Sequence, residues 1–106
     1  MGHPLWRPKR LAQKLLHIRS TFGLSQSQLL DSLGLTDEIE YTRISDYERN
    51  KTAPPLPVLV EYARLAGVHL EEIADDRLDL PTELPGTVTY EAWNRRRPKR
   101  SKTKTT

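Results

Sequence analysis

Cationic and hydrogen-bonding side chains gather between residues 42 and 51, in a combination suited to a nucleic acid. Arg43 and Arg49 can neutralise phosphates. Thr42 can offer a methyl group to thymine and a hydroxyl to a base edge, and Asp46 can accept a hydrogen bond from the amine of cytosine. Such chemistry requires a rigid element that presents these residues together.

Other chemistries find little support in the residue types. The sequence holds no nucleophile–base–acid set and no glycine-rich phosphate loop, so we expect neither enzymatic activity nor a cofactor. There is no cysteine, and His3, His17 and His69 are scattered, so no metal site is expected. We interpret Asp75 and Asp76 as a solvated pair and not as a catalytic dyad.

Length and charge set the next limits. A chain of 106 residues allows one small domain. The absence of cysteine, of a signal-peptide core and of an apolar run near the roughly 20 residues that span a membrane favours a cytoplasmic protein. Residues 95–106 hold seven basic and no acidic residues, whereas residues 1–94 hold ten basic and fourteen acidic residues, a net charge of −4. Any attraction for phosphates must therefore be local or come from the chain ends.

A first helix is predicted by apolar residues at helical spacing: Leu11, Leu15, Ile18 and Phe22. Gly23 is expected to end it. We interpret the cations interspersed with these residues as its solvated face: Lys9, Arg10, Lys14 and Arg19.

A second, short helix is predicted from Ser25, which forms a capping box with Gln28, to a sharp end at Gly34. A third runs from about residue 38 or 41 to residue 49, with Ile44 and Tyr47 facing inward. Two short helices joined at an angle can place the second one in the major groove of DNA.

Two further helices are expected, one from residue 56 to Gly67 and one over residues 68–73, which gives an all-α bundle over residues 9–76. Residues 1–8 are expected to form an irregular arm, residues 77–94 an extended segment packed on the domain, and residues 95–106 a disordered basic tail. Pro81, Pro85 and Gly86 argue against a helix in the extension, where residues 87–90 alternate as a strand would.

The order of these features resembles the Cro/repressor-type (Xre-type) helix-turn-helix family. The resemblance covers roughly residues 9–74 and rests on Leu24-Ser25-Gln26, Leu33-Gly34-Leu35, Tyr47-Glu48-Arg49-Asn50-Lys51, Pro55-Leu56, Tyr62-Ala63-Arg64 and Leu70-Glu71-Glu72-Ile73. It implies a five-helix, lambda-repressor-like bundle that binds double-stranded DNA in a sequence-specific manner, often as a homodimer on a palindrome.

The resemblance also implies residue roles. Gln26 falls where the family bridges a phosphate and a base contact. Tyr41, Thr42 and Asp46 fall where its recognition helix reads bases, with Ser45 on the same helix, and phosphate contacts are implied for Arg43, Arg49 and Lys51.

Two departures from the family pattern leave alternatives open. The stretch from Gly34 to Ile44 is about four residues longer than usual, and it either extends the third helix or forms a longer loop. Leu30 stands where the family prefers a small residue.

Charge leaves further alternatives. The acidic residues of the longer connection, Asp37, Glu38 and Glu40, are explained by the helix dipole without any DNA. Arg43 and Arg49 could pair with Glu40 and Glu48 instead of phosphates. The alternative function is therefore a helix-turn-helix that acts as a protein-interaction module, with a sequence-blind basic tail.

Overall fold

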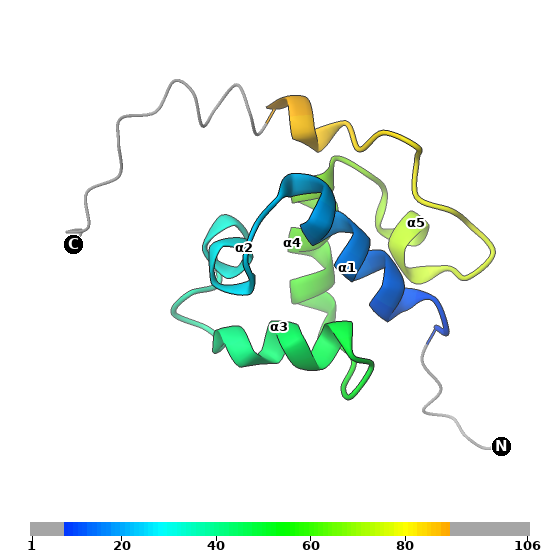
Figure 1. The fold of residues 1–106 in the computed structure, drawn as a ribbon. Helices are drawn as coiled ribbons and strands as arrows, with labels where there is room; N and C mark the ends of the chain where they lie inside the picture. The colour runs from blue at the N-terminus through cyan, green and yellow to red at the C-terminus, as the bar shows by residue number, and fades with distance from the viewer. Residues whose placement is uncertain (1–7, 90–106) are drawn as a thin grey trace, which may run out of the picture.

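The computed structural model describes residues 8–89 and confirms the predicted all-α bundle (Figure 1). Its helices are α1 (Leu11–Phe22), α2 (Gln26–Ser32), α3 (Tyr41–Glu48), α4 (Leu56–Ala66) and α5 (Leu70–Ala74). A helical turn at residues 86–89 follows. The predicted N-terminal arm, except Pro8, and the predicted basic tail lie outside the described residues.

The helix boundaries follow from local sequence signals. Ser25 and Gln28 form the predicted capping box: the Gln28 amide donates to the Ser25 hydroxyl at 3.1 Å and the Ser25 amide donates to the Gln28 side chain at 2.9 Å. Gly23 and Gly67 adopt the left-handed conformation that ends α1 and α4. Gly34 has φ of 74°, and the next amide, of Leu35, reaches back to the carbonyl of Leu30. The chain thereby turns sharply out of α2.

The core is apolar and draws on all five helices. Leu15, Ile18, Leu29, Ile44 and Ile73 are fully buried in it. Around it, α1 contacts α3, α4 and α5, α4 contacts α5, and α2 contacts α3. Burial of this apolar surface is the main stabilising contribution expected in a bundle of this size.

The prediction of a solvated cationic face on α1 is wrong for two of its members. Lys14 is 4% exposed, and its Nζ donates to the backbone carbonyls of Glu72, Asp75 and Leu78 at 2.8, 2.9 and 2.7 Å. These carbonyls lie at and beyond the end of α5, where backbone acceptors lack helical partners. Lys14 therefore caps α5 from α1, and burial lowers the pKa of its ammonium group. Arg19 pairs with α3, as described below.

Asp76 ties the start of α1 to the segment after α5. Its carboxylate accepts hydrogen bonds from the backbone amides of Lys9 and Arg10 at 2.8 and 2.9 Å. Arg10 also pairs with Asp79, and Asp75 pairs with Arg77. The interpretation of the two neighbouring aspartates as a merely solvated pair is therefore wrong, because each has a defined partner.

Acid is expected to weaken this junction. Hydrogen bonds from Arg77 lower the pKa of Asp75 to about 2, and those from Arg10 and Lys9 lower the pKa of Asp76. Each carboxylate contributes stability that is present above its unfolded-state pKa of about 4 and is lost as pH falls through the lower folded-state value. Circular dichroism should show a melting temperature that falls from about pH 4 to about pH 2. The fall should be shallower in Asp76→Ala, and equal slopes in both proteins would contradict the assigned role.

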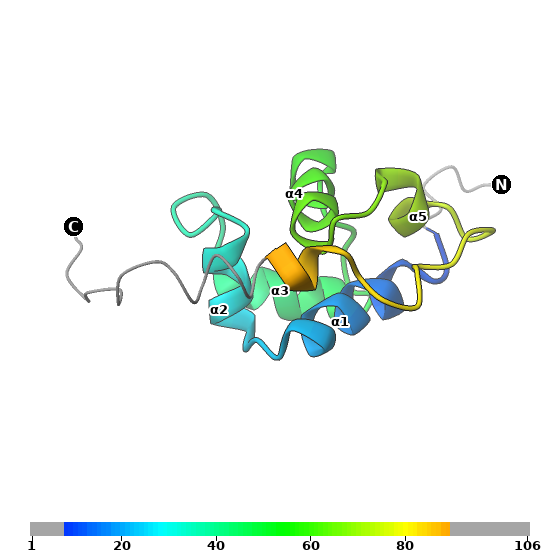
Figure 2. The same ribbon diagram turned by 90° about the horizontal axis from the view of Figure 1, so that it is seen from above.

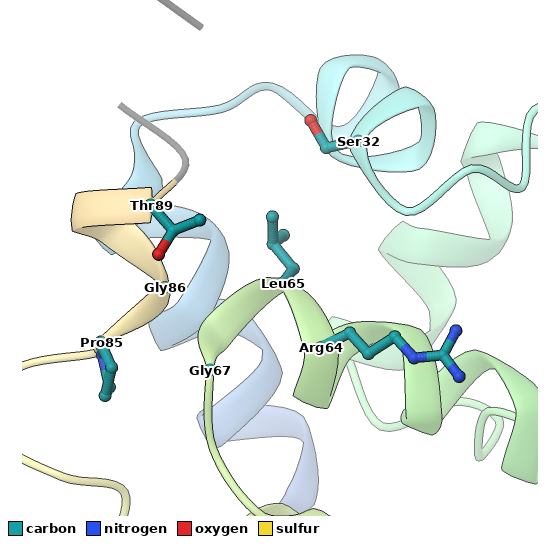
Figure 3. Close-up of a pocket in the computed structure, with 7 residues that line it drawn as sticks. All are labelled: Ser32, Arg64, Leu65, Gly67, Pro85, Gly86 and Thr89. Carbon is teal, nitrogen blue, oxygen red and sulfur yellow. The ribbon is translucent and has the colours of Figure 1, made fainter. Parts of the chain in front are cut away.

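Over residues 77–89 the segment after α5 packs on the bundle, but its residues 86–89 are helical and not extended as predicted. Leu84 is 2% exposed, and residues 86–89 form a helical turn. Gly86 makes this packing possible: a Cβ at this position would lie 1.8 Å from the carbonyl oxygen of Leu65, in α4. Figure 3 shows the turn beside the end of α4, around a cavity of about 310 Å³ that also reaches Ser32 of α2. Close packing of Gly86 against the backbone of α4 therefore determines the helical conformation of residues 86–89. Neither the Pro85-Gly86 pair nor the alternation of residues 87–90 indicated this conformation.

Helix α3 lies at one side of the bundle. In Figure 1, α3 runs along the bottom of the molecule while the 86–89 turn lies at the top. Figure 2 gives the view from above, in which α3 lies behind α1, and the main neighbours of α3 are α1 and α2. Among residues 8–89, no other helix covers one long side of α3, and this side carries the predicted site residues.

Candidate nucleic-acid interface

The outward side of α3 presents most of the predicted site residues. Ile44 and Tyr47 are buried at 0% and 4% exposure, which fixes the inward side of the helix. At 100° per residue, the opposite side carries Thr42, Asp46 and Arg49. Thr42 and Arg49 are exposed and Asp46 is half-buried.

The remaining α3 residues flank this side. Tyr41 is 54% exposed and Arg43 is exposed, one on each edge, whereas Ser45 is half-buried. The Ser45 hydroxyl accepts a hydrogen bond from Nη1 of Arg49 at 3.4 Å. This contact corrects one alternative from the sequence, since Arg49 pairs with Ser45 and not with Glu48.

A tight turn fixes the position of Lys51 just beyond α3. Asn50 has φ of 60°, the left-handed conformation that asparagine tolerates better than most residues. The Lys51 amide donates to the carbonyl of Asp46 at 2.8 Å, and the Asn50 amide donates to that of Tyr47 at 3.2 Å. This pattern is the Schellman motif, and it leaves the exposed Lys51 side chain next to the end of the outward side.

Glu48 holds α3 against the two preceding helices. Its side chain is 5% exposed and forms a bidentate pair with Arg19 of α1, at 2.7 Å to Nε and 2.9 Å to Nη2. The remaining guanidinium nitrogen of Arg19 donates to the carbonyl of Leu24 at 2.9 Å. Donation to the Glu48 carboxylate raises the pKa of Arg19, so the guanidinium stays charged. A planar two-point contact of this kind fixes the orientation of α3 as well as its distance.

Gln26 belongs to the same cluster. It lies in the first turn of α2, is half-buried, and its Nε2 donates to Oε1 of Glu48 at 3.3 Å. The Gln26 side chain is therefore held toward α3. Gln26 is thus joined to α3 through its side chain, whereas Lys51 is joined to α3 through its backbone amide.

The sequence did not identify Arg19 and Glu48 as partners. Glu48 was considered only as a surface partner for arginines of its own helix. A signal was present nonetheless, because Glu48 follows Ile44 by four residues and so shares the inward side of α3. A carboxylate on that side needs a buried cation, and Arg19 is the cation that α1 supplies.

The longer connection between α2 and α3 forms a loop and does not extend α3. Residues 36–38 make a turn in which the amides of Glu38 and Ile39 donate to the carbonyl of Leu35. Leu30 is buried, and it lines a groove of about 460 Å³ with Ile39 and Tyr41, among others. The acidic side chains of Asp37, Glu38 and Glu40 are exposed on this loop. The outward side of α3 thus begins beside a patch of negative charge.

Two buried tyrosines, Tyr47 of α3 and Tyr62 of α4, lie on the inward side of α3 and are uncharged. Tyr47 and Tyr62 are 4% and 0% exposed, and burial raises the pKa of both phenols. Both side chains therefore remain neutral at physiological pH, and Arg19–Glu48 is the ion pair that lies behind α3 within residues 8–89.

Other site types are not found in the described part of the chain. Between residues 8 and 89, no three carboxylate or imidazole groups are placed to hold a metal ion. None of the helices in this range has the length and apolarity needed to cross a bilayer.

Comparison with known proteins gives one match. The sequence profile of the helix-turn-helix family matches residues 18–73, which include α2, the connection and α3. No curated protein and no solved structure gives a match.

Proposed function

The chain belongs to the Cro/repressor-type (Xre-type) helix-turn-helix family, a family of DNA-binding domains, and we propose that it binds specific double-stranded DNA sequences through α3 and regulates transcription. The observation that carries this proposal is the division of α3 into two sides. Ile44, Tyr47 and Glu48 fix one side to the bundle, while Thr42 and Arg49 stand exposed on the other. A helix held in this way can enter the major groove as a rigid unit.

The exposed residues have distinct roles in this proposal. Arg43, Arg49 and Lys51 contact phosphates, since they are exposed cations along the edge and end of α3. Thr42 and Asp46 face base edges, with Tyr41 at the start of the helix and Ser45 orienting Arg49. Gln26, held by Glu48 at the end of α3, joins α2 to this surface and contacts the phosphate backbone of the DNA.

Charge limits the affinity that α3 can supply. Residues 1–94 carry a net charge of −4, and three carboxylates lie on the loop before α3. Phosphates near that loop would be repelled, more strongly at low salt. We therefore assign part of the affinity to the seven cations of residues 95–106, which add an attraction that is independent of sequence.

The test compares two substitutions on a selected duplex and a random duplex. Arg43→Ala is expected to weaken binding to both duplexes by a similar factor and to reduce the salt dependence by about one phosphate contact. Thr42→Ala is expected to weaken binding to the selected duplex alone, by about 1–3 kcal/mol. Fluorescence anisotropy at several salt concentrations measures both effects. Identical behaviour of the two variants would remove the assignment of α3 as the reading element.

A second candidate, a protein-interaction module, is favoured by one observation: the exposed carboxylates of Asp37, Glu38 and Glu40 beside the start of α3. Replacing the seven cations of residues 95–106 with glutamine separates the two functions. If the variant still prefers the selected duplex, the domain reads DNA. If it binds no duplex while the native chain binds all duplexes equally, the tail alone binds DNA and the domain serves another partner.

A further inference from the structure

A stripe of four polar residues runs along the outward side of α3, and its centre is acidic. The stripe begins at Thr42 and continues three, four and seven residues later with Ser45, Asp46 and Arg49. This spacing aligns side chains on one face of a helix. Along this stripe Asp46 is the one carboxylate. A DNA-reading helix with a negative charge at its centre must meet a base that compensates for it.

Asp46 forms no ion pair with the cations on either side of it, Arg43 and Arg49, within the described residues. It is half-buried, and among residues 8–89 its side chain forms no hydrogen bond or ion pair. Arg49, three residues away, is instead bound to the Ser45 hydroxyl. The backbone around Asp46 is fixed, because its carbonyl accepts from the Lys51 amide at 2.8 Å. The backbone that carries the carboxylate is therefore held in place, and the carboxylate itself is free to accept a hydrogen bond from a ligand.

An ionised carboxylate accepts hydrogen bonds and cannot donate them. In the major groove guanine presents two acceptors, thymine an acceptor and a methyl group, and adenine an acceptor beside its amine. Cytosine presents only an amine donor. The four bases therefore rank in a definite order opposite Asp46, with cytosine first, adenine second, and guanine and thymine disfavoured.

We propose that Asp46 determines specificity for a C·G base pair, with the cytosine amine donating to its carboxylate. The proposal rests on the function proposed above and assigns the base chemistry at the centre of the site. Thr42 lies four residues earlier, about 6 Å along the helix axis. Thr42 and Asp46 are thus far enough apart to contact different bases of the same site.

The experiment begins with selection of duplexes from a random pool by the full-length protein. Affinities are then measured for the four base pairs at each selected position, with the native protein, Asp46→Ala and Asp46→Asn. The native protein is expected to prefer cytosine over guanine and thymine at one position by about tenfold. Asp46→Ala should lose the preference for cytosine and should keep the base preference at the position that Thr42 contacts. Asp46→Asn should shift the preference toward adenine, because an amide both donates to N7 and accepts from the amine.

Asp37→Asn is the matched control. It removes one exposed carboxylate from the loop without changing the stripe, so it should raise the affinity for every duplex and leave the base preferences unchanged. Circular dichroism verifies that each variant is folded.

The outcomes separate this inference from the proposed function. If selection yields a defined sequence and Asp46→Ala keeps the native preference at every position, the inference is wrong and the function stands. A native preference for guanine or thymine at the position that Asp46→Ala alters would also overturn the inference. If the native protein selects no sequence at all, the proposed function fails, and this inference fails with it.

Discussion

Replacing Glu48 with alanine is expected to lower the free energy of unfolding by about 3 kcal/mol, because the partly buried Arg19 would be left without its partner. The pair is well placed for this effect, since the side chains of Arg19 and Glu48 are 21% and 5% exposed and meet at two points. For a domain of this size each kcal/mol corresponds to about 4–8 °C in melting temperature. The variant should therefore melt at least about 10 °C lower.

The double substitution Arg19→Met with Glu48→Leu tests the cause. Replacing both partners with apolar side chains removes the buried charges together, so the double variant should lose less stability than the sum of the two single variants. Glu83→Ala serves as a control, because Glu83 is exposed and its side chain makes no contact of this kind within residues 8–89. Additive losses in a double-mutant cycle would mean that the pair does not act as a unit.

Glu48→Ala also has an expected effect on DNA binding. The substitution removes the acceptor that holds Gln26 toward α3 and the contact that orients α3 on α1. Even at a temperature where the variant is folded, affinity for a selected duplex should decline more than affinity for a random one. The reason is that base contacts depend on orientation, whereas phosphate attraction depends mainly on charge.

The second large effect is expected for Lys14→Met, at about 3 kcal/mol of stability. Three carbonyl groups, of Glu72, Asp75 and Leu78, would lose the same charged donor, and methionine fills the space without replacing it. The loss should be local first. Hydrogen exchange is expected to accelerate in α5 before it does in α2 or α3, because Lys14 connects α1 to the end of α5.

Lys9→Met is the matched control for Lys14→Met. Lys9 is exposed, and within residues 8–89 its ammonium group donates no hydrogen bond, so the same change of side chain should cost little. Urea unfolding of both variants gives the comparison. Equal free energies of unfolding for Lys9→Met and Lys14→Met would show that the hydrogen bonds of Lys14 to the three carbonyls add nothing to the stability beyond what an exposed lysine contributes.

Much of the outward side of α3 was predictable, because it depends on local rules. The spacing of Ile44 and Tyr47 orients the helix, and this orientation determines that Thr42, Arg43 and Arg49 are exposed. What contacts these residues make with DNA stays a prediction. The partner of Glu48 was not predictable in the same way, because Arg19 lies 29 residues away on another helix.

The sequence by itself determined the five helices of the bundle and most of their ends, although not the start of α3. Ser25, Gly23, Gly34 and Gly67 act within one or two turns of the chain, through capping hydrogen bonds and left-handed conformations that neighbouring residues suffice to define. The apolar spacing likewise selected the residues of the core, since burial depends on which face a residue occupies.

Only the tertiary structure decided which charges are buried and how the chain continues after α5. Lys14 is buried because carbonyls 58 to 64 residues away converge on it, and the turn at residues 86–89 forms where Gly86 packs against the backbone of α4. These outcomes depend on contacts between segments distant in sequence. A pattern of spacing and propensity within one segment carries no information about such contacts. For that reason the sequence does not distinguish the cations at α1, although Lys14 is buried in the fold and Lys9 is exposed.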